Sequence, residues 1–374
     1  MTTNKQNINA VTKLSAHILS RRFIAFTALI SMAAYLVSCE SPRVTKTFYA
    51  MGGIPVNIIA VGLSDTTLQR VTEKAAQSVE EWEAELSMYR ESSAINQLHK
   101  KKDTPVLLTA KGWQALQAAR EAETITGGAF DVTIGPVVRL WKDAEKKGVL
   151  PDSDALAKAL SFTGFDNLIF DESNRSIRVN AQDSISDDEP ESGFVLDVGG
   201  IAKGLFAEWL NDQIVESLTQ KEKNCLKKLI VDLSGDMYVR SFTKNDLCVV
   251  GIRDPFSSDR SKLWGTLSIQ KGAVVTSGTY ERYFEIDGRR YCHIIDPKTG
   301  YPVSNDIVSV TIVDPSGAMA DALATAVFVL GEEKGIELIH SRVQTEMVLI
   351  RSDKTWFASE GLRNNLRQID LTRH

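Results

Sequence analysis

Hydrophobic side chains recur at helical spacing in three stretches of the chain. Residues 68–86 carry one every three or four positions, which predicts a single helix with one apolar face. A second helix is predicted to begin at Thr109 and to stop near Gly127. Residues 318–330 are apolar almost throughout, which predicts an apolar helix that ends at Gly331.

Alternating apolar and polar positions predict strands between these helices. Residues 47–61 fit two strands around a turn at Gly52 and Gly53, and residues 168–179 fit a hairpin that turns at residues 172–174. Further strands are predicted at residues 228–233, 247–252, 308–313 and 345–350. Helices and strands mix without regular βαβ alternation, so the predicted fold class is α+β rather than a doubly wound sheet.

The N-terminus has the pattern of an export signal. Arg21 and Arg22 precede an uncharged apolar run at residues 23–37, which is short for a membrane span but typical of a secretory signal. Residues 36–39 read Leu-Val-Ser-Cys, which resembles a bacterial lipoprotein box and implies cleavage before Cys39 and a lipid on its thiol. An uncleaved signal anchor is the alternative, and the export route stays open.

Composition narrows the class of protein. Of the 374 residues, 43% are hydrophobic and 24% are charged, which excludes a largely disordered or fibrous chain. Residues 1–38 hold four basic and no acidic residues, so the remainder has 39 basic against 48 acidic residues and a net charge of −9. A body this acidic is unsuited to nonspecific binding of nucleic acid, so nucleic acid is not expected as a partner.

Cysteine spacing and the common catalytic signatures disfavour further classes. The four cysteines lack CxxC spacing and have no nearby pair of histidines, which disfavours a zinc site and a disulfide scaffold. The sequence contains no Walker A loop, no GxGxxG fingerprint, no HExxH and no GxSxG. The usual NTPase, dinucleotide-binding, zinc-protease and serine-hydrolase sites are therefore not expected.

Two glycine-containing segments are candidates for binding an anionic or flat ligand. Residues 195–204 predict an apolar strand, paired glycines and a helix that contains Lys203, an arrangement that lets a phosphate approach the backbone. The alternative is a tight turn beside a solvated lysine. In residues 128–136, Phe130 could stack on a flat ring while Asp131 accepts hydrogen bonds, or the segment is a strand edge that enters the core.

Two further segments carry groups for acid–base or metal chemistry. Residues 293–302 contain a predicted type I turn that could hold His293 beside a ligand, and a hairpin turn with a half-buried histidine is the alternative. Asp321 and Thr325 are four residues apart and share a helix face, where carboxylate and hydroxyl oxygens suit Mg²⁺. The alternative is that Asp321 caps the helix or complements its dipole.

Eight motifs occur in an order that resembles the ApbE family, the FAD:protein FMN transferases, over about residues 45–350. They are residues 51–53, 87–96, 129–131, 196–204, 231–236, 276–283, 293–302 and 320–325. Two departures are mild: Gly53 stands where the family usually has threonine, and Ser234 stands where it often has glycine. Both leave the ligand positions intact.

The resemblance implies a T-fold-like α+β architecture in one large catalytic body. By position, it implies a lipoprotein signal at residues 1–38, a lipidated tether at residues 39–46 and the transferase domain at residues 47–374. It implies FAD as substrate. The implied flavin-binding residues are Met51, Tyr89, Ala129, Phe130, Asp131, Asp197, Lys203 and Ile295.

The resemblance also implies Mg²⁺ as cofactor. Asp321, Thr325 and the backbone carbonyl of Gly200 match the metal ligands of the family. His293 and Asp321 match its catalytic positions, and the base that accepts the proton of the acceptor is expected to be His293.

The implied reaction joins FMN to a threonine or serine hydroxyl of an acceptor protein through a phosphoester and releases AMP. The implied acceptors are flavin-carrying subunits of membrane redox pumps, of the sodium-pumping quinone reductase or Rnf type. The implied location is lipid-anchored at a membrane, with the catalytic body on the periplasmic side. The alternatives are a hydrolase that splits FAD into FMN and AMP, and a flavin-binding lipoprotein without catalytic activity.

Overall fold

The computed structural model describes residues 41–100, 104–180 and 193–369, and its compact unit begins at Arg43. Cys39 and the predicted signal that precedes it lie outside the described residues. None of the described helices combines the length and the hydropathy that a bilayer span requires.

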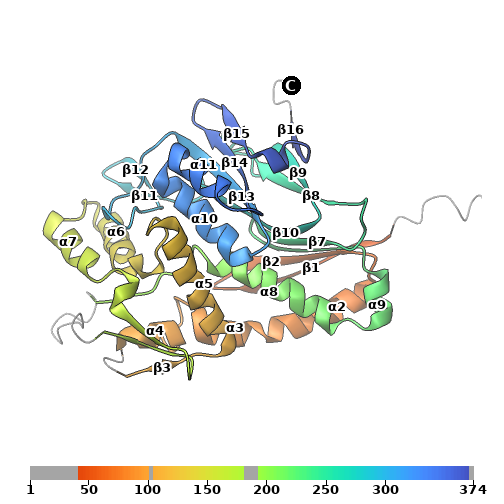
Figure 1. Ribbon diagram of the computed structural model, residues 1–374, viewed down its shortest axis with the longest axis horizontal. Helices are drawn as coiled ribbons and strands as arrows, with labels where there is room; N and C mark the ends of the chain where they lie inside the picture. The colour runs from red at the N-terminus through yellow and green to blue at the C-terminus, as the bar shows by residue number, and fades with distance from the viewer. Residues whose placement is uncertain (1–40, 101–103, 181–192, 370–374) are drawn as a thin grey trace, which may run out of the picture. The chain divides into compact units, whose positions relative to one another are not determined.

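An eight-stranded antiparallel sheet forms the centre of this unit, in the order β1-β2-β6-β7-β10-β13-β14-β15 (Figure 1). Seven of the eight residues of β13 are buried, because other layers cover both faces of the sheet. The strands are β1 (Arg43–Ala50), β2 (Ile54–Val61), β6 (Lys228–Leu233), β7 (Asp236–Ser241), β10 (Lys271–Gly278), β13 (Ile307–Asp314), β14 (Glu346–Arg351) and β15 (Trp356–Ala358).

Helices cover one face of the sheet and form the main apolar core with it. Helix α8 (Ala202–Ser217) packs on β6 and β7, and α10 (Gly317–Leu330) packs on β10 and β13 and beside α8 (Figure 1). The other helices are α2 (Asp65–Gln77), α3 (Val79–Leu86), α4 (Ala94–Lys100), α5 (Ala110–Thr126), α9 (Gln220–Cys225) and α11 (Glu332–His340).

The opposite face of the sheet packs on a smaller one, in the order β16-β9-β8. Val250 and Trp264 from the small sheet and Val274 and Val348 from the large sheet belong to one buried cluster. The strands of the small sheet are β8 (Cys248–Arg253), β9 (Leu263–Ile269) and β16 (Leu366–Gln368).

A third apolar cluster surrounds Trp141, a residue of α6 (Gly135–Lys147). It includes Phe284 of β11 (Tyr283–Ile286), which pairs with β12 (Arg289–Cys292), and Leu156 of α7 (Ser153–Ser161). The indole N–H of Trp141 donates to the carbonyl of Gly300 at 2.8 Å. The loop that follows β12 is thereby fixed to the body.

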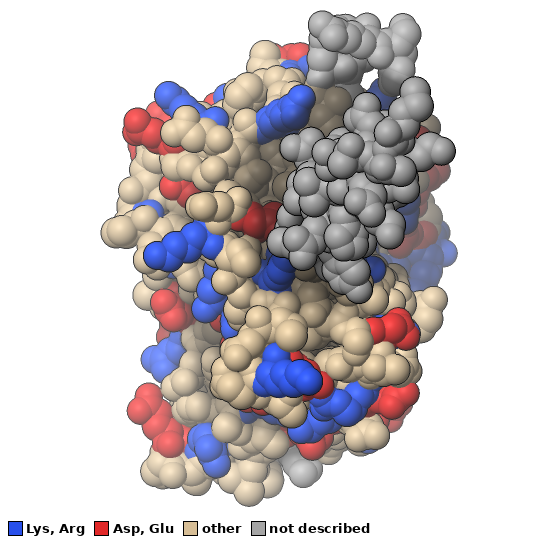
Figure 2. All heavy atoms as spheres, turned by 90° about the vertical axis from the view of Figure 1, so that its right-hand side faces the viewer, with Lys and Arg blue, Asp and Glu red and all other residues tan. Residues whose placement is uncertain are grey.

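The remaining regular elements are short. A three-stranded sheet has the order β3-β5-β4, and single-turn 3₁₀ helices lie near the loops. They are β3 (Val106–Leu107), β4 (Leu168–Asp171), β5 (Ser176–Val179), η1 (Val132–Ile134), η2 (Phe165–Asn167) and η4 (Glu360–Leu362). On the face that Figure 2 shows, Lys and Arg side chains are interspersed with Asp and Glu, so neither charge dominates its visible part.

Most of the predicted elements are confirmed. The hydroxyl of Thr109 caps α5, and Gly127 ends it in the left-handed region at φ 59°. Helix α10 ends at Leu330, directly before Gly331. Each strand predicted from alternation is present, and its ends lie within two residues of the predicted ones. The exception is β1, which begins earlier, at Arg43.

Two local predictions are wrong. The helix predicted over residues 68–86 is two helices, because Ser78 interrupts the backbone ladder: its N–H donates to Ala75, and its hydroxyl donates to the carbonyl of Lys74. The strand predicted before the paired glycines is a buried segment that joins no sheet among the described strands. Its backbone instead bonds to η1, because the N–H of Asp197 donates to the carbonyl of Val132.

Candidate functional site

Three charged side chains meet where α8 begins. The ammonium of Lys203 forms an ion pair with Asp236 and lies 3.6 Å from a carboxylate oxygen of Asp321. The side chains are 25%, 8% and 3% exposed, respectively. We call these three residues the Lys203 cluster. Its burial overturns the alternative in which Lys203 is a solvated lysine.

Close packing of α8 on α10 creates the cluster. A Cβ atom at Gly204 would collide with the carbonyl of Gly317, and one at Gly317 would collide with the carbonyl of Gly204. Glycine at both positions therefore lets the two backbones touch. At this distance the N–H of Gly204 donates to Asp321 at 3.1 Å, while Glu208 accepts from the N–H of Gly317 at 2.7 Å.

Asp236 reaches the cluster through a tight turn between β6 and β7. Ser234 and Gly235 both have positive φ, at 55° and 105°, so the chain reverses within two residues. Asp236 is then the first residue of β7, with its carboxylate at the start of α8.

Burial and mutual attraction shift the pKa values of the charged groups in the Lys203 cluster. Burial raises the pKa of Asp321 to about 6, and the nearby Lys203 ammonium opposes this change. Burial alone would lower the pKa of Lys203, but Asp236 and Asp321 outweigh it and raise that pKa. Lys203 is therefore firmly protonated, whereas the carboxylate of Asp321 is left short of positive charge.

Asp321 does not cap its helix. The residue that caps α10 is Ser316, whose hydroxyl accepts from the N–H of Met319. Asp321 lies one turn further along and is buried against α8. The interpretation of Asp321 as the cap of α10 is therefore wrong, because its carboxylate faces Gly204 and Lys203 of α8 instead.

The predicted metal ligands lie close together. Thr325 is one turn after Asp321 and its hydroxyl donates to the Asp321 carbonyl at 3.4 Å. A Cβ atom at Gly200 would lie 3.4 Å from that hydroxyl and 3.0 Å from the ring of Phe130. Only glycine fits between these two side chains without displacing one of them.

These oxygen atoms fit a hard cation. Within the described ranges, no three His, Cys, Asp or Glu side chains gather as a metal cluster. Mg²⁺ needs no such cluster, since it is usually held by one or two carboxylates and keeps several waters. A carboxylate, a hydroxyl and a backbone carbonyl are the donor types that it prefers.

His293 lies directly after β12, and a hydrogen bond fixes the position of its ring. Its Nδ1 is 2.8 Å from the carbonyl of Arg282. Because a carbonyl only accepts, Nδ1 carries the proton and the neutral ring keeps its free electron pair on Nε2. Burial, and then the positive charges of Arg282 and Lys203, lower the pKa of His293 below 6.5 although the hydrogen bond to Arg282 opposes them. A neutral His293 is suited to accept a proton.

The ring of Tyr89 packs against Gly52, the residue that follows Met51. The N–H of Met51 donates to Glu83 at 2.8 Å, and a Cβ atom at Gly52 would lie 3.2 Å from the ring of Tyr89. Tyr89 is 69% exposed, so most of this ring is available to a ligand.

Asp197 shapes the glycine turn itself. Its carboxylate accepts from the N–H of Gly199 at 2.9 Å. The Cε methyl group of Met88 lies 3.4 Å from the position of a Cβ atom on Gly199, which connects this turn to the Tyr89 segment.

The other predicted flavin-binding residues have structural partners. Ala129 and Phe130 are buried, and Phe130 supports Gly200 rather than presenting a free face. Asp131 caps η1, with one oxygen accepting from the N–H and hydroxyl of Thr133, and burial raises its pKa. The alternative in which this segment is a strand edge is wrong. Ile295 is buried in the cluster around Trp141.

Sequence reasoning missed two residues of the site. Asp236 and Arg282 both fall within motifs that were singled out, at residues 231–236 and 276–283. Nothing local distinguishes their roles, because Asp236 acts on Lys203, 33 residues away. The positive charge of Arg282 reaches both Lys203 and His293.

Comparison with known proteins gives a consistent result. A model described as the ApbE family matches residues 52–349. An FAD:protein FMN transferase of Treponema pallidum (strain Nichols) is 35% identical over 302 residues, which cover 78% of this chain and 80% of that protein. A protein of the same name from Klebsiella pneumoniae (strain 342) is 29% identical, with 81% and 89% of the two chains covered.

Solved structures extend the likeness to the fold. An ApbE protein from Thermotoga maritima has a TM-score of 0.71 at 26% identity, covering 86% of this chain and 98% of that one. The flavin transferase ApbE from Vibrio cholerae has a TM-score of 0.69 at 26% identity, covering 87% and 99%.

Proposed function

The chain belongs to the ApbE family and is an FAD:protein FMN transferase, and we propose that it joins FMN to a serine or threonine hydroxyl of an acceptor protein. The observation that supports this reaction best is the Lys203 cluster beside Thr325 and Gly200. It combines a fixed ammonium with a buried carboxylate that is short of positive charge. A pyrophosphate with its cation would complement both.

Asp321, Thr325 and the Gly200 carbonyl would hold Mg²⁺. When bound, Mg²⁺ would supply positive charge that neutralises the pyrophosphate of FAD. Lys203 would orient a phosphate oxygen, since its ammonium is held in place by two carboxylates. Asp197 would keep the glycine turn in the shape that lets the backbone approach the ligand.

His293 would act as the base. The acceptor hydroxyl gives its proton to Nε2 while Nδ1–H remains bound to the Arg282 carbonyl. The hydroxyl oxygen then forms a bond to the FMN-side phosphorus of FAD. The bond from that phosphorus to the bridging oxygen breaks, and AMP leaves with this oxygen. The acceptor keeps FMN through a phosphoester.

The decisive experiment uses the purified body, FAD, Mg²⁺ and a candidate acceptor, such as a flavin-carrying subunit of a membrane redox pump. Intact-mass measurement should show the acceptor heavier by one FMN less one water, and AMP should appear in equal amount. Release of FMN and AMP at the same rate without acceptor would favour an FAD hydrolase. FAD binding without any cleavage would favour a storage protein.

Lipid anchoring is the second part of the proposal, and it rests on the sequence before Arg43. We expect Cys39→Ser to abolish labelling by a fatty-acid probe and to release the protein from the membrane fraction. The purified body should keep its activity, because every proposed ligand lies at Met51 or later. Unchanged labelling of the variant would contradict this assignment.

A further inference from the structure

The hairpin β11–β12 leads straight into His293. Its two-residue turn, Asp287 and Gly288, has positive φ at both positions, 48° and 69°, as in a type I′ turn. The turn fixes the register, in which Ile286 is opposite Arg289. Figure 1 shows this hairpin beside α6.

The register determines which backbone groups face outward. In a hairpin with a two-residue turn, the pair next to the turn is hydrogen-bonded, and such pairs then alternate with unbonded ones. Glu285 and Arg290 form the next pair, so their N–H groups point away from each other. The N–H of Glu285 donates to Glu145 of α6 at 3.2 Å, as this pattern requires.

The two edges of the hairpin therefore differ. The β11 edge is covered by α6 through Glu145. On the β12 edge, the backbone groups of Arg290 and Cys292 face outward, and β12 pairs with no strand other than β11 in the part of the chain that the structure describes. An unpaired strand edge is a template for another extended chain.

The open edge ends at the proposed base. His293 follows Cys292, the last residue of β12. The ladder pattern would place the next bond at the carbonyl of Arg282, and that carbonyl accepts from the ring of His293 instead. A chain paired with β12 would thus lie next to His293.

The strand β12 itself carries positive charge. Arg289 and Arg290 are both exposed, and Arg289 forms no ion pair within the described ranges. Arg290 already has partners: it lies 4.4 Å from the ring centre of Tyr283 and 3.8 Å from a carboxylate oxygen of Glu285.

We propose that the outer edge of β12 binds the acceptor protein as a third strand of this small sheet. The bound segment is extended, carries an acidic residue opposite Arg289, and delivers its serine or threonine hydroxyl to His293. This inference rests on the proposed transferase function. It adds the docking mode: main-chain hydrogen bonds supply affinity, and Arg289 favours an acidic sequence.

The test compares two proline variants of the same hairpin. Arg290→Pro removes an outward N–H from the β12 edge, and Glu285→Pro removes one from the β11 edge, without deleting a ladder bond. With the acceptor that wild type modifies, Arg290→Pro should raise the acceptor KM at least tenfold, and at least fivefold above Arg290→Ala. Glu285→Pro should change it less than threefold, and FAD affinity should be unchanged in both.

Equal acceptor KM values in the two proline variants would overturn the docking mode while leaving the transferase function intact. Absence of transfer by wild type would instead overturn the transferase function. A dimer of wild type that Arg290→Pro dissociates without raising KM would identify a second copy of the chain as the occupant, and would also overturn the proposal.

A second measurement does not depend on folding of the variants. Two peptides of the acceptor sequence are N-methylated at alternate residues, so that one loses the N–H groups facing β12 and the other loses those facing away. Only one of them should inhibit transfer by wild type. Equal inhibition by the two peptides would contradict pairing along a strand edge.

Discussion

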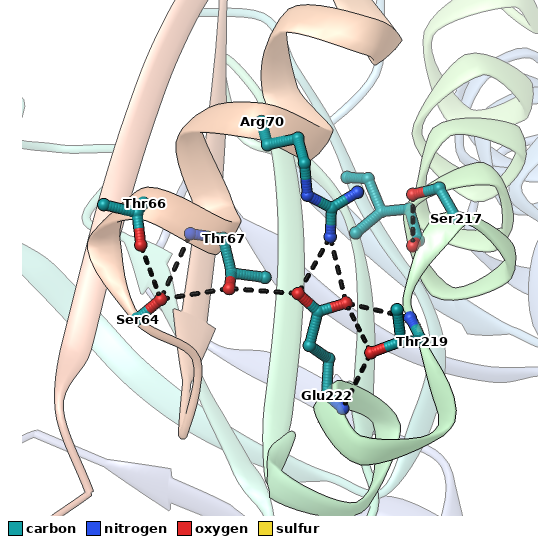
Figure 3. Close-up of polar contacts among 8 residues, drawn as sticks. Ser64, Thr66, Thr67, Arg70, Ser217, Thr219 and Glu222 are labelled. Atoms are coloured by element: carbon teal, nitrogen blue, oxygen red, sulfur yellow. Dashed lines mark hydrogen bonds and ion pairs between the residues drawn. The ribbon is translucent and has the colours of Figure 1, made fainter.

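Two carboxylates of this protein lie beside cations, and folding gives them opposite properties. Glu222 belongs to what we call the Glu222 cluster, with Thr67, Arg70 and Thr219 (Figure 3). Arg70 donates to both of its oxygens at 2.9 Å, and the N–H of Thr219 donates at 2.8 Å. The hydrogen bond from the Thr219 backbone is the main reason that the pKa of Glu222 is lowered to about 2.

Asp321 in the Lys203 cluster shows the reverse. It has a cation 3.6 Å away and one backbone donor, yet burial raises its pKa to about 6. Glu222 is 23% exposed and accepts from two residues of α2 and from the N-cap residue of α9, whereas Asp321 is 3% exposed.

The difference separates a structural carboxylate from a binding one. The Glu222 cluster is complete in itself: it joins α2 to α9 and needs no ligand. The Lys203 cluster leaves charge uncompensated, and such groups gather at functional sites. The comparison predicts that equivalent substitutions in the two clusters affect different properties.

The largest effect is expected for Asp321→Asn. Asparagine keeps the shape and can still accept from Gly204, but it removes the anionic metal ligand. The rate of FMN transfer should fall by about 10²–10³-fold, the loss that other enzymes show when one group that stabilises transition-state charge is removed. The melting temperature should stay within a few degrees of wild type. Transfer rate against Mg²⁺ concentration checks this.

Thr325→Val and Glu222→Gln are the matched controls for that experiment. Thr325→Val deletes a neutral ligand, so its loss should be smaller and raised Mg²⁺ should partly restore it. Glu222→Gln should transfer at the wild-type rate. A wild-type rate in Asp321→Asn, or full activity in excess EDTA, would contradict the metal assignment.

Lys203→Ala comes next and should affect stability as well as binding. Removing one partner of a fully buried pair costs about 3–5 kcal/mol. Lys203 is 25% exposed, so we expect a loss of about 2–3 kcal/mol in the free energy of unfolding. Urea unfolding with and without Mg²⁺ measures it, and Mg²⁺ should restore part of the loss. Unchanged stability would mean that water, not Lys203, compensates the two carboxylates.

Glu222→Gln should cost about 1 kcal/mol of unfolding free energy at pH 7, in the range of a helix cap. The folded-state pKa of Glu222 lies below the ordinary value of 4.5, so its stabilisation is complete above pH 4.5 and declines as pH falls towards 2. The difference between wild type and variant should therefore shrink from pH 7 to pH 3.5. A constant difference would assign the effect to packing.

The smallest effect tests whether nearby positive charge sets the pKa of His293. Lys203 and Arg282 both lower the pKa of His293, after burial. Because the neutral ring is the base, transfer should persist below pH 6.5 and fail as His293 becomes protonated. Arg282→Gln removes one positive charge, so the acidic limb of the pH–rate profile should move to higher pH. A limb that stays in place would exclude His293 as the titrating base.

Caps, stop signals and alternation within short segments predicted many of the helices and strands. Helix α5 has its cap at Thr109 and its stop at Gly127 within its own sequence, and the alternation of β6 is independent of its neighbours. The break at Ser78 was not predicted, because the helix was inferred from the spacing of apolar residues. The Ser78 hydroxyl bonds to the Lys74 carbonyl without changing that spacing. The segment before the paired glycines has the composition of a strand but lacks a pairing partner.

Caps, turns and periodicity act over a few residues, so they were enough to predict the fold class and the order of the elements. The order of eight motifs was enough to indicate the family. The sequence also singled out Lys203, Asp321 and His293 one at a time. The contact of Lys203 with both Asp236 and Asp321 could not be predicted in this way, because it depends on packing between distant segments. That contact depends on two glycine backbones touching between α8 and α10, and on a sheet order that places distant strands side by side. The pKa of Asp321 follows from the same packing, since burial is a property of the whole fold.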